Sequence, residues 1–598
     1  MTHQKRLQTM SGKIFVLLWL PLMLVLGYGF GHLKKETEFW TGDRDLFRTI
    51  GVRPAPLPQS RSGPASAVAP VKEVRFAEFR NTGVDFVYEN GPDGQFHLAE
   101  TLGGGVGAFD FDNDGHVDLV FADGGNPVTW ASSHQQRIQL YRHYEATSFR
   151  AVAAAASMSW TGYGHGCAVA DVNNDGFDDL LVTGYQTSAL FMNQGDGTFR
   201  EAPGWQNLTS ERWCATAGFS DFDGDGDVDV YIACYAATPR NLPTAVCESE
   251  GKRIHCNPHT YPAVPDMMIE NTGNGRFVDR SESSGIAAFA EYGLGVSVAD
   301  LDSDGTLEIF VANDGRRNLL FRQASNWKYE EIALGSGVAF NGQGESMGSM
   351  GIACADFDRN GWLDLLTTNF AYERNVLCAN LGGLAFVDMS QGTPMDVFSR
   401  TTVGWSAVTL DADLDGFSDV FIANGHVTPM PSQSWPQRPH LFRGGLSGLQ
   451  LCGETGGYFE QNWHARGACR VDLNEDGVDD LVVSHIDAKA SLLRNDTSSI
   501  GNGLNLRLVG TVSCRSAAGT IVEVETAAGM TVYNVSRNGG YLSSNTNLQR
   551  IGVGQAERVD VVRIRWPTGQ IREVRNVPTN IPVTIIEGRP TPVKSIVR

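Results

Sequence analysis

A nine-residue stretch rich in aspartate, residues 221–229 (DFDGDGDVD), has the residue types and spacing of a Ca²⁺-binding turn. Carboxylates stand at positions 1, 3, 5 and 9, and position 6 is glycine, which permits a sharp turn. Alternate side chains of a tight turn point inward, so these oxygens and the carbonyl of residue 7 could surround one ion. Without a cation the carboxylates would repel one another. The stretch therefore predicts a metal site.

The same pattern occurs seven times in the chain. The further copies begin at Asp110, Asp171, Asp300, Asp356, Asp411 and Asp472, and successive starts are 61, 50, 79, 56, 55 and 61 residues apart. Copies at this spacing indicate an internal repeat, and such a repeat determines the fold. We number the copies loop one to loop seven in chain order.

Each loop offers five predicted ligands: the side chains at positions 1, 3, 5 and 9 and the backbone carbonyl at position 7. By loop, they are Asp110, Asp112, Asp114, His116 and Asp118; Asp171, Asn173, Asp175, Phe177 and Asp179; Asp221, Asp223, Asp225, Asp227 and Asp229; Asp300, Asp302, Asp304, Thr306 and Glu308; Asp356, Asp358, Asn360, Trp362 and Asp364; Asp411, Asp413, Asp415, Phe417 and Asp419; and Asp472, Asn474, Asp476, Val478 and Asp480. The predicted cofactor is Ca²⁺, with up to seven ions per chain. Loops two, five and seven are expected to bind it most weakly, because asparagine replaces one carboxylate in each.

The residues around the loops distinguish β-hairpins from EF-hands. An EF-hand needs a bidentate glutamate at position 12, where these loops have Phe121, Val182, Ile232, Val311, Thr367, Ile422 and Val483. Small alternating segments precede the loops, as at residues 105–109, and β-branched runs follow them, as at 230–233. Each loop is therefore predicted to be the turn between two β-strands.

A second repeated phrase predicts another hairpin in each repeat. Residues 190–199 (LFMNQGDGTF) recur in weaker form at 268–277 and 376–386, and glycine-rich turns between apolar runs are typical of tight hairpins. Seven repeats of about four strands can close into a ring in which each blade packs only on its neighbours. We therefore predict an all-β fold with a seven-bladed β-propeller over residues 73–500.

The amino-terminal region has the pattern of a membrane anchor. Residues 14–30 are 17 uncharged, mostly apolar residues that follow Lys5, Arg6 and Lys13. This length is at the lower limit for a transmembrane helix, and the basic flank should stay in the cytoplasm. We interpret residues 1–31 as an uncleaved signal anchor, with a cleaved signal peptide as the alternative, and 32–72 as a juxtamembrane region and Pro/Ala/Ser linker. The rest is then expected on the periplasmic or cell-surface side, or secreted after cleavage.

Four motifs lie near the carboxyl end: residues 513–524 (SCRSAAGTIVEV), 539–543 (GGYLS), 551–554 (IGVG) and 562–569 (VRIRWPTG). Short alternating segments there predict a small β-sandwich or barrel. With the seven loops, these motifs make the chain resemble the FG-GAP/VCBS-repeat, integrin-α-like propellers that carry an ASPIC/UnbV domain. The resemblance assigns residues 501–590 to that domain and leaves 591–598 as a tail.

Ten cysteines follow the predicted export segment, where disulfides are permitted. A proline-rich insertion between loops three and four holds Cys247 and Cys256, and an irregular loop benefits from a covalent link. Relatives in the family that the chain resembles often have a cysteine pair there, so we predict this disulfide. Three other pairings compete with buried free thiols: Cys214–Cys234, Cys354–Cys378 and Cys452–Cys469. No C-x₂-C spacing occurs, which argues against zinc.

Four polar residues beside the hairpins have glycine neighbours: Glu100, His165, His426 and Arg466. Such positions in a propeller lie near the central channel or a rim, so these residues could line a binding site. The alternative is that they are hydrogen-bonded structural residues at blade junctions. No catalytic residues are predicted.

The acidity of the chain has a local cause. Its net charge is −21, and 25 of its 68 acidic residues stand at loop positions 1, 3, 5 and 9. Seven bound Ca²⁺ would bring the net charge to about −7. A nucleic-acid partner is not predicted, because no basic face is evident that could neutralise phosphates.

Three functions are compatible with the sequence. The first is a calcium-stabilised extracytoplasmic binding or adhesion module, whose unknown protein or glycan ligand binds on a propeller face. The second is a polysaccharide lyase or hydrolase on a Ca²⁺ propeller, which would need an unrepeated acid, base and arginine in one cleft. The third is a structural partner in an envelope complex at the membrane, in which the propeller docks another protein and calcium only makes it rigid.

Overall fold

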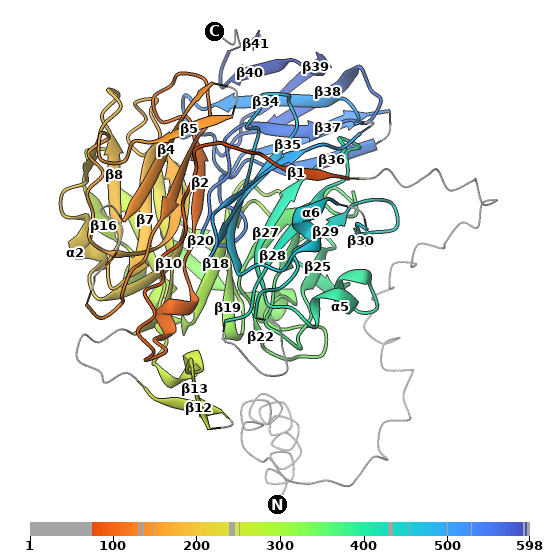
Figure 1. Ribbon diagram of the computed structural model, residues 1–598. Helices are drawn as coiled ribbons and strands as arrows, with labels where there is room; N and C mark the ends of the chain where they lie inside the picture. Colours follow the sequence, from red (N-terminus) through yellow and green to blue (C-terminus); the bar gives the residue numbers. More distant parts are fainter. Residues whose placement is uncertain are drawn as a thin grey trace, which may run out of the picture. The chain divides into compact units, whose positions relative to one another are not determined.

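The computed structural model describes residues 74–594, apart from positions 130–131, 133–136, 146, 238–244, 250, 428–434, 454, 499, 528 and 590–591. The predicted anchor, the linker and most of the predicted tail lie outside these residues. Among the helices of the described part, none combines the length and the apolar character needed to cross a bilayer. This part is all-β with short helices (Figure 1).

Seven sheets of the described part follow one plan, in which a predicted loop connects the first two strands. The first three sheets comprise β2 (Val106–Phe109), β3 (Asp118–Ala122), β4 (Ile138–Glu145) and β5 (Ser148–Ala151); β6 (Tyr163–Ala170), β7 (Asp179–Tyr185), β8 (Ala189–Asn193) and β9 (Phe199–Glu201); and β10 (Arg212–Ser220), β11 (Asp229–Ala237), β15 (Met267–Asn271) and β16 (Phe277–Asp279). Each set is antiparallel, and neighbours in the sheet are neighbours in this order.

The other four sheets repeat the plan. They comprise β18 (Gly293–Ala299), β19 (Glu308–Arg316), β20 (Leu319–Ser325) and β21 (Lys328–Glu331), with β22 (Met347–Gly348) also paired to β19; β23 (Ile352–Ala355), β24 (Asp364–Thr367), β25 (Val376–Asn380) and β26 (Phe386–Asp388); β27 (Gly404–Leu410), β28 (Asp419–Asn424), β29 (His440–Arg443) and β30 (Gln450–Leu451); and β31 (Ala465–Val471), β32 (Asp480–His485), β33 (Ser491–Asn495) and β1 (Phe76–Glu78). The last strand of the seventh sheet thus comes from the start of the described chain. Phe76 lies opposite Asn495 in this antiparallel pair.

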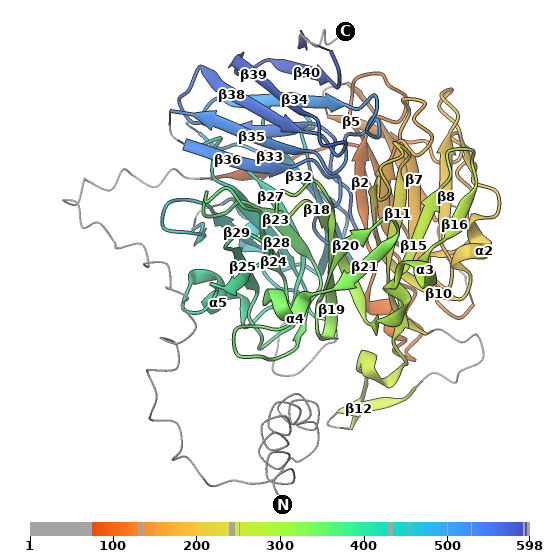
Figure 2. The ribbon, with the colours of Figure 1, turned by 180° about the vertical axis from the view of Figure 1, so that it is seen from behind.

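The seven sheets pack in chain order, and the last packs on the first. Phe109 and Val182, for example, belong to one buried cluster between sheets one and two. Leu119 and Val482 belong to another between sheets one and seven. Because each sheet buries its faces against its two neighbours, the arrangement is propeller-like (Figures 1 and 2).

The carboxyl-terminal region adds two four-stranded sheets. One contains β37 (Gln549–Gly552), β34 (Gly503–Val509), β40 (Pro582–Ile586) and β41 (Val593–Lys594), and the other contains β36 (Gly529–Asn534), β35 (Ile521–Thr526), β38 (Arg558–Arg565) and β39 (Ile571–Pro578). Residues of both sheets, including Leu506, Val562 and Trp566, share one buried cluster. The described residues therefore form the sandwich rather than the closed barrel of the two predicted forms.

A loop of this sandwich enters the middle of the ring. Ser544 exchanges backbone hydrogen bonds with β2, accepting from the Ala108 N–H and donating to the Val106 carbonyl. Gly540 exchanges bonds with Ile352 of β23, and the Leu542 carbonyl accepts from Cys167 of β6. The predicted GGYLS motif thus joins the inner strands of sheets that are far apart in sequence.

The sandwich also covers the predicted loops. The backbone N–H of Arg515 donates to Asn174 Oδ1 of loop two at 3.0 Å, and the guanidinium of Arg565 donates to the Ser303 carbonyl of loop four at 2.9 Å. Gly501 donates to the Asp413 carbonyl of loop six at 2.7 Å. The end of the ring that carries the loops therefore faces the carboxyl-terminal sandwich (Figures 1 and 2).

The remaining elements are short. They are the small hairpin of β12 (Cys247–Ser249) and β13 (Lys252–Ile254), the two-stranded sheet of β14 (Val264–Pro265) and β17 (Ala290–Glu291), and the helices η2 (Leu98–Thr101), α2 (Trp205–Thr209), η3 (Pro258–Thr260), α3 (Ser281–Ser284), η4 (Ile286–Ala288), α4 (Ala333–Ser336), α5 (Pro394–Ser399) and α6 (Gly457–Glu460). Hairpin β12–β13 lies in the predicted proline-rich insertion.

The predicted Cys247–Cys256 disulfide is confirmed, with a Cα–Cα distance of 5.2 Å. The six cysteines of the three alternative pairings are free thiols. Cys354 and Cys378 lie on either side of β24 and both pair with Leu365, so a strand separates them. Cys469 lies in β31, whereas Cys452 follows β30 of the preceding sheet. Cys214 and Cys234 do lie opposite each other, but as buried thiols.

Candidate metal centres

Backbone geometry gives all seven loops the same sharp turn. The glycine at position 6 has φ between 88° and 97° in every loop, a region that favours glycine. Its N–H donates to the position-1 carboxylate at 2.8–3.1 Å. The residue at position 4 is left-handed as well, with Leu414 at 53° as an example. The sequence predicted the glycine, but not this second left-handed residue.

The residue with the position-9 carboxylate is buried in every loop, with at most 1% of it exposed. One of its oxygens accepts the N–H of position 2 at 2.8–3.0 Å in all seven loops. In six loops its other oxygen accepts an N–H from the third strand of the same sheet, as when Asn271 donates to Asp229 at 2.8 Å. The first three strands of these six sheets therefore position this group.

At least four loops bring oxygen atoms of three carboxylates close enough together to bind one metal ion. The oxygen atoms of Asp110, Asp112 and Asp118; of Asp221, Asp223 and Asp225; of Asp300, Asp302 and Asp304; and of Asp356, Asp358 and Asp364 lie within 4.8 Å of one another. Oxygens at this spacing could share one cation. In each of these four loops, three of the predicted carboxylate ligands therefore lie together.

Burial makes these carboxylates poor anions without a cation. It raises the pKa of Asp221 to about 6 and that of Asp229 to about 9, and it raises the pKa of Glu308 to about 9. Three carboxylate oxygens, Asp112 Oδ1, Glu308 Oε1 and Asp413 Oδ1, are buried without a hydrogen-bond partner. A hard divalent cation would satisfy them, so the donor set fits Ca²⁺.

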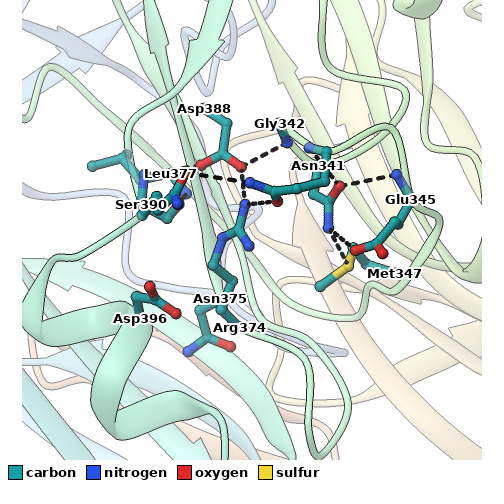
Figure 3. Close-up of polar contacts among 12 residues, drawn as sticks. Asn341, Gly342, Glu345, Met347, Arg374, Asn375, Leu377, Asp388, Ser390 and Asp396 are labelled. Atoms are coloured by element: carbon teal, nitrogen blue, oxygen red, sulfur yellow. Dashed lines mark hydrogen bonds and ion pairs between the residues drawn. The ribbon is translucent and has the colours of Figure 1, made fainter. Parts of the chain in front are cut away.

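A buried carboxylate outside the loops shows the contrast (Figure 3). Asp388 pairs with Arg374 at 2.7 Å and accepts N–H groups from Gly342 at 2.8 Å and Ser390 at 2.9 Å. Burial raises its pKa, but these donors outweigh burial and the pKa is lowered. Its anion is stabilised by the protein itself, and no metal is needed there.

Four of the loops receive an arginine that the sequence did not reveal, and in loop two it is Arg515, which lies 3.6 Å from Asp171. Arg142 contacts Asp112 at 2.6 Å and Asp114 at 2.9 Å in loop one. Arg443 contacts Asp413 at 2.7 Å and Asp415 at 2.5 Å in loop six. Arg550 of the sandwich contacts Asp472 at 3.1 Å in loop seven. A guanidinium at these positions supplies some of the charge that a metal would supply.

Side-chain amides connect five of the seven loops to the next sheet. Asn193, Asn271, Asn380 and Asn495 end the third strands of four sheets, and each donates from Nδ2 to the position-2 carbonyl of the preceding loop at 2.8–2.9 Å. Gln323 does the same for loop three at 2.8 Å. The repeated asparagine in the second sequence phrase was the signal for this role.

The four polar residues with glycine neighbours are all buried. Arg466 donates to the carbonyls of Thr101 at 2.9 Å and His426 at 3.4 Å, and its guanidinium lies 4.2 Å from the Trp405 ring centroid. His165 accepts from the Trp213 indole at 3.0 Å, and burial lowers its pKa to about 3. Arg466 and His165 therefore have the hydrogen-bonded structural role that was the alternative to a binding site.

Family models match both repeated and terminal regions of the chain. A model described as FG-GAP-like repeat matches residues 110–182, 171–232 and 300–367, and a model described as ASPIC and UnbV matches residues 510–592. The chain therefore contains FG-GAP-like repeats and an ASPIC/UnbV domain, as the resemblance implied.

Cartilage acidic protein 1 is a relative at low identity. The human protein is 23% identical over 348 residues, which cover 55% of this chain and 48% of that protein. The Xenopus tropicalis protein is 25% identical over 388 residues, which cover 55% of this chain and 58% of that protein. The chain thus spans about half the length of these curated relatives.

Solved structures share only slight likeness. An Agrocybe aegerita lectin that recognises non-reducing terminal N-acetylglucosamine has a TM-score of 0.34 and 14% identity, and the match covers 71% of this chain and 94% of the lectin. An exotype rhamnogalacturonan lyase has a TM-score of 0.27 and 11% identity over 69% of this chain and 91% of the enzyme. Scores at this level carry no argument about ligand or reaction.

Proposed function

We propose that the chain is a calcium-stabilised, extracytoplasmic seven-bladed β-propeller that serves as a binding module for a protein or glycan ligand. The observation that carries this proposal is the repeated gathering of buried carboxylates in sharp hairpin turns. Their burial raises the pKa of groups such as Asp221 and Asp229, and a bound divalent cation would remove that penalty.

The packing order supports a closed ring of seven blades. Each sheet shares a buried cluster with the next, and sheet one shares a cluster with sheet seven. β1 completes sheet seven, so the two ends of the repeat region are fastened within one sheet. Such a closure leaves every blade with two neighbours and stabilises the ring as a whole.

The two ends of the ring differ in accessibility. The ASPIC/UnbV sandwich covers the loop end through residues such as Arg515 and Arg565. We therefore place the ligand at the opposite end, where hairpin β12–β13 lies in both views (Figures 1 and 2). In this arrangement calcium stabilises the ring and its attachment to the sandwich, and the ligand binds elsewhere.

An extracytoplasmic location is supported by the Cys247–Cys256 disulfide and by the relationship to cartilage acidic protein 1. Anchoring by residues 1–31 stays a prediction. It is tested by washing membranes that contain the full chain with high salt and alkali, because an integral anchor resists both treatments and a peripheral attachment does not.

Metal content and thermal stability test the calcium proposal directly. The full chain, purified in millimolar Ca²⁺ and freed of loose ions, is expected to retain several Ca²⁺ by elemental analysis and to melt at a lower temperature in chelator. A chain that carries no divalent ion and whose melting is unaffected by chelator would rule out the proposal.

The ligand class needs a separate experiment. Glycan arrays and pull-downs from solubilised envelopes, each with and without chelator, distinguish an adhesion module from a partner in a complex. Turnover of a polyuronate by the same preparation would instead support the polysaccharide-active alternative.

A further inference from the structure

Two segments that are far apart in sequence meet at the end of the ring that carries hairpin β12–β13. Arg253 donates to Gln95 Oε1 at 2.7 Å, and the rings of Phe96 and His255 meet edge to face with centroids 5.1 Å apart. His255 directly precedes Cys256, whose disulfide closes the hairpin. The hairpin is thus held in a defined position against the segment that leads into η2.

Two imidazole–carboxylate pairs lie at this contact, and they share one cluster of three residues through Glu100. His97 Nε2 lies 3.3 Å from Asp93 Oδ2, and His255 Nε2 lies 3.4 Å from Glu100 Oε2. Ligand atoms of Asp93, His97 and Glu100 all lie within 4.8 Å of one another. The Glu100 side chain is 4% exposed and the two histidines 10–11%, whereas Asp93 is 34% exposed. The cluster is therefore nearly enclosed, with access beside Asp93.

Two of the separations between these donors suit a tetrahedral metal ion. Zinc bonds of about 2.0–2.1 Å to nitrogen and oxygen place neighbouring ligand atoms roughly 3.3 Å apart in a tetrahedron. The two histidine–carboxylate separations, 3.3 and 3.4 Å, are close to this value, and both exceed the roughly 2.8 Å of a charge-assisted hydrogen bond. Two imidazole donors favour a Zn²⁺-type ion over Ca²⁺, which prefers six to eight oxygens.

We propose that Asp93, His97, Glu100 and His255 form a Zn²⁺ site that fastens hairpin β12–β13 to the ring. The backbone N–H of His97 donates to Glu100 Oε1 at 3.1 Å and so orients this carboxylate, while Oε2 faces His255. The absence of C-x₂-C pairs argued against zinc, but this site uses no cysteine. It is separate from the seven loops in donor type and in position on the ring.

Cobalt is the probe for this site, because tetrahedral Co²⁺ absorbs visible light and takes the place of Zn²⁺. The full chain is stripped of metal, supplied with excess Ca²⁺ to fill the loops, and titrated with Co²⁺. One Co²⁺ per chain is expected, with a tetrahedral spectrum that one equivalent of Zn²⁺ abolishes. A native chain that binds no Co²⁺ under these conditions, or binds it with an octahedral spectrum, would overturn the proposal.

Variants assign the ion to these residues. His97→Ala and His255→Gln are each expected to weaken Co²⁺ binding at least about tenfold, since each loses a direct ligand. The matched control is His464→Ala, which removes a histidine that pairs with Asp487 at 3.1 Å elsewhere on the ring and should leave binding unchanged. Calcium-dependent melting, measured on every variant, verifies that the ring is folded. Native-like Co²⁺ binding by the folded His97→Ala/His255→Gln double variant would contradict the assignment of the ion to these residues.

Discussion

Loops three and six have the same carboxylates at positions 1, 3, 5 and 9, yet their surroundings differ in charge. In loop six, Arg443 at the end of β29 contacts Asp413 at 2.7 Å and Asp415 at 2.5 Å. In loop three, the corresponding third-strand residue is Glu270, which pairs with Arg280 at 2.6 Å instead. Loop three therefore has no guanidinium from its third strand, and it carries an additional acid, Asp227.

The difference shows that counting carboxylates is not enough to rank the sites. A guanidinium inside a loop neutralises charge and occupies the ligands, so it competes with a cation. Loops one and six have four carboxylates but also Arg142 and Arg443, whereas loop three gathers Asp221, Asp223 and Asp225 without either. We expect loop three to bind Ca²⁺ most tightly. Loop seven, with Asn474 and Arg550, is expected to bind it most weakly.

The largest expected effect is that of removing all Ca²⁺, and it depends on pH. Burial raises the pKa of Asp221 to about 6 and of Asp229 to about 9, so the folded metal-free chain holds protons that the unfolded chain releases near pH 4. The stability from these protons is present below the unfolded pKa and is lost as the pH rises through the folded values. Calcium replaces the protons, and a site filled at a hundredfold excess over Kd contributes about 2.7 kcal/mol.

Melting temperatures in calcium and in chelator, measured from pH 5 to about pH 9, test this dependence. The metal-free chain is expected to lose stability as the pH rises across this range. The difference between the melting temperatures in calcium and in chelator should therefore widen with rising pH. A difference that stays constant or narrows towards high pH would show that the loop carboxylates do not hold these protons.

The next effect sharpens the comparison by removing the arginine from loop six. Arg443→Gln leaves Asp413, which is fully buried, without its cationic partner, and breaking such a pair destabilises a protein by about 3–5 kcal/mol. We expect this loss in chelator and a large recovery on adding Ca²⁺, because the vacated ligands can then bind the ion. Chemical denaturation with and without Ca²⁺ measures both. The comparison fails if the calcium-induced gain is no greater than in the native chain.

Loop three should respond in the opposite way. Asp223→Ala removes a ligand where no third-strand arginine is available, so the calcium-dependent stability of one site, about 2.7 kcal/mol at saturating Ca²⁺, should disappear. Stability in chelator should change little, because removing one of several like charges relieves repulsion. Asp560→Ala is the control, since Asp560 is exposed and lies outside every loop. An equal loss in chelator and in calcium would mean that Asp223 has a structural role only.

The contrast between these loops also marks the limit of what the sequence could predict. The loops themselves, the hairpins and the ASPIC/UnbV region follow from local patterns: glycine at position 6, alternating strands and the GGYLS motif. Arg443 and Arg550 reach loops from distant positions, and only the packed sheets bring them there. The sequence also did not identify β1 as the closing strand of sheet seven, because its partner β33 is more than 400 residues away along the chain.

The zinc ligands show the same limit in a different form. The glycine neighbours of Glu100 made it a candidate binding-site residue. Asp93 and His97, by contrast, stand four residues apart in an irregular segment, with no repeat to identify them. His255 joins them only because the disulfide-closed hairpin folds onto this segment. Local spacing can identify a metal site that is formed by a single loop. A site formed by two distant segments can be identified only once the fold is known.

The smallest expected effect concerns a residue that binds no metal. Asn271 donates from Nδ2 to the Val172 carbonyl in loop two at 2.8 Å and to the Val228 carbonyl in loop three at 3.3 Å. Asn271→Ala leaves both buried carbonyls without this donor and should destabilise the chain by about 1–2 kcal/mol. Asn274→Ala, in the exposed turn of the same hairpin, should have no effect.

Because Asn271 fixes two loops at once, its loss should weaken calcium binding at both loops. Calcium titrations of Asn271→Ala in the Asp223→Ala background separate the two contributions. Loop three is already empty in that background, so any further loss of calcium binding belongs to loop two. If no further loss occurs, neighbouring loops bind independently, and the charge within each loop alone explains why loop three differs from loop six.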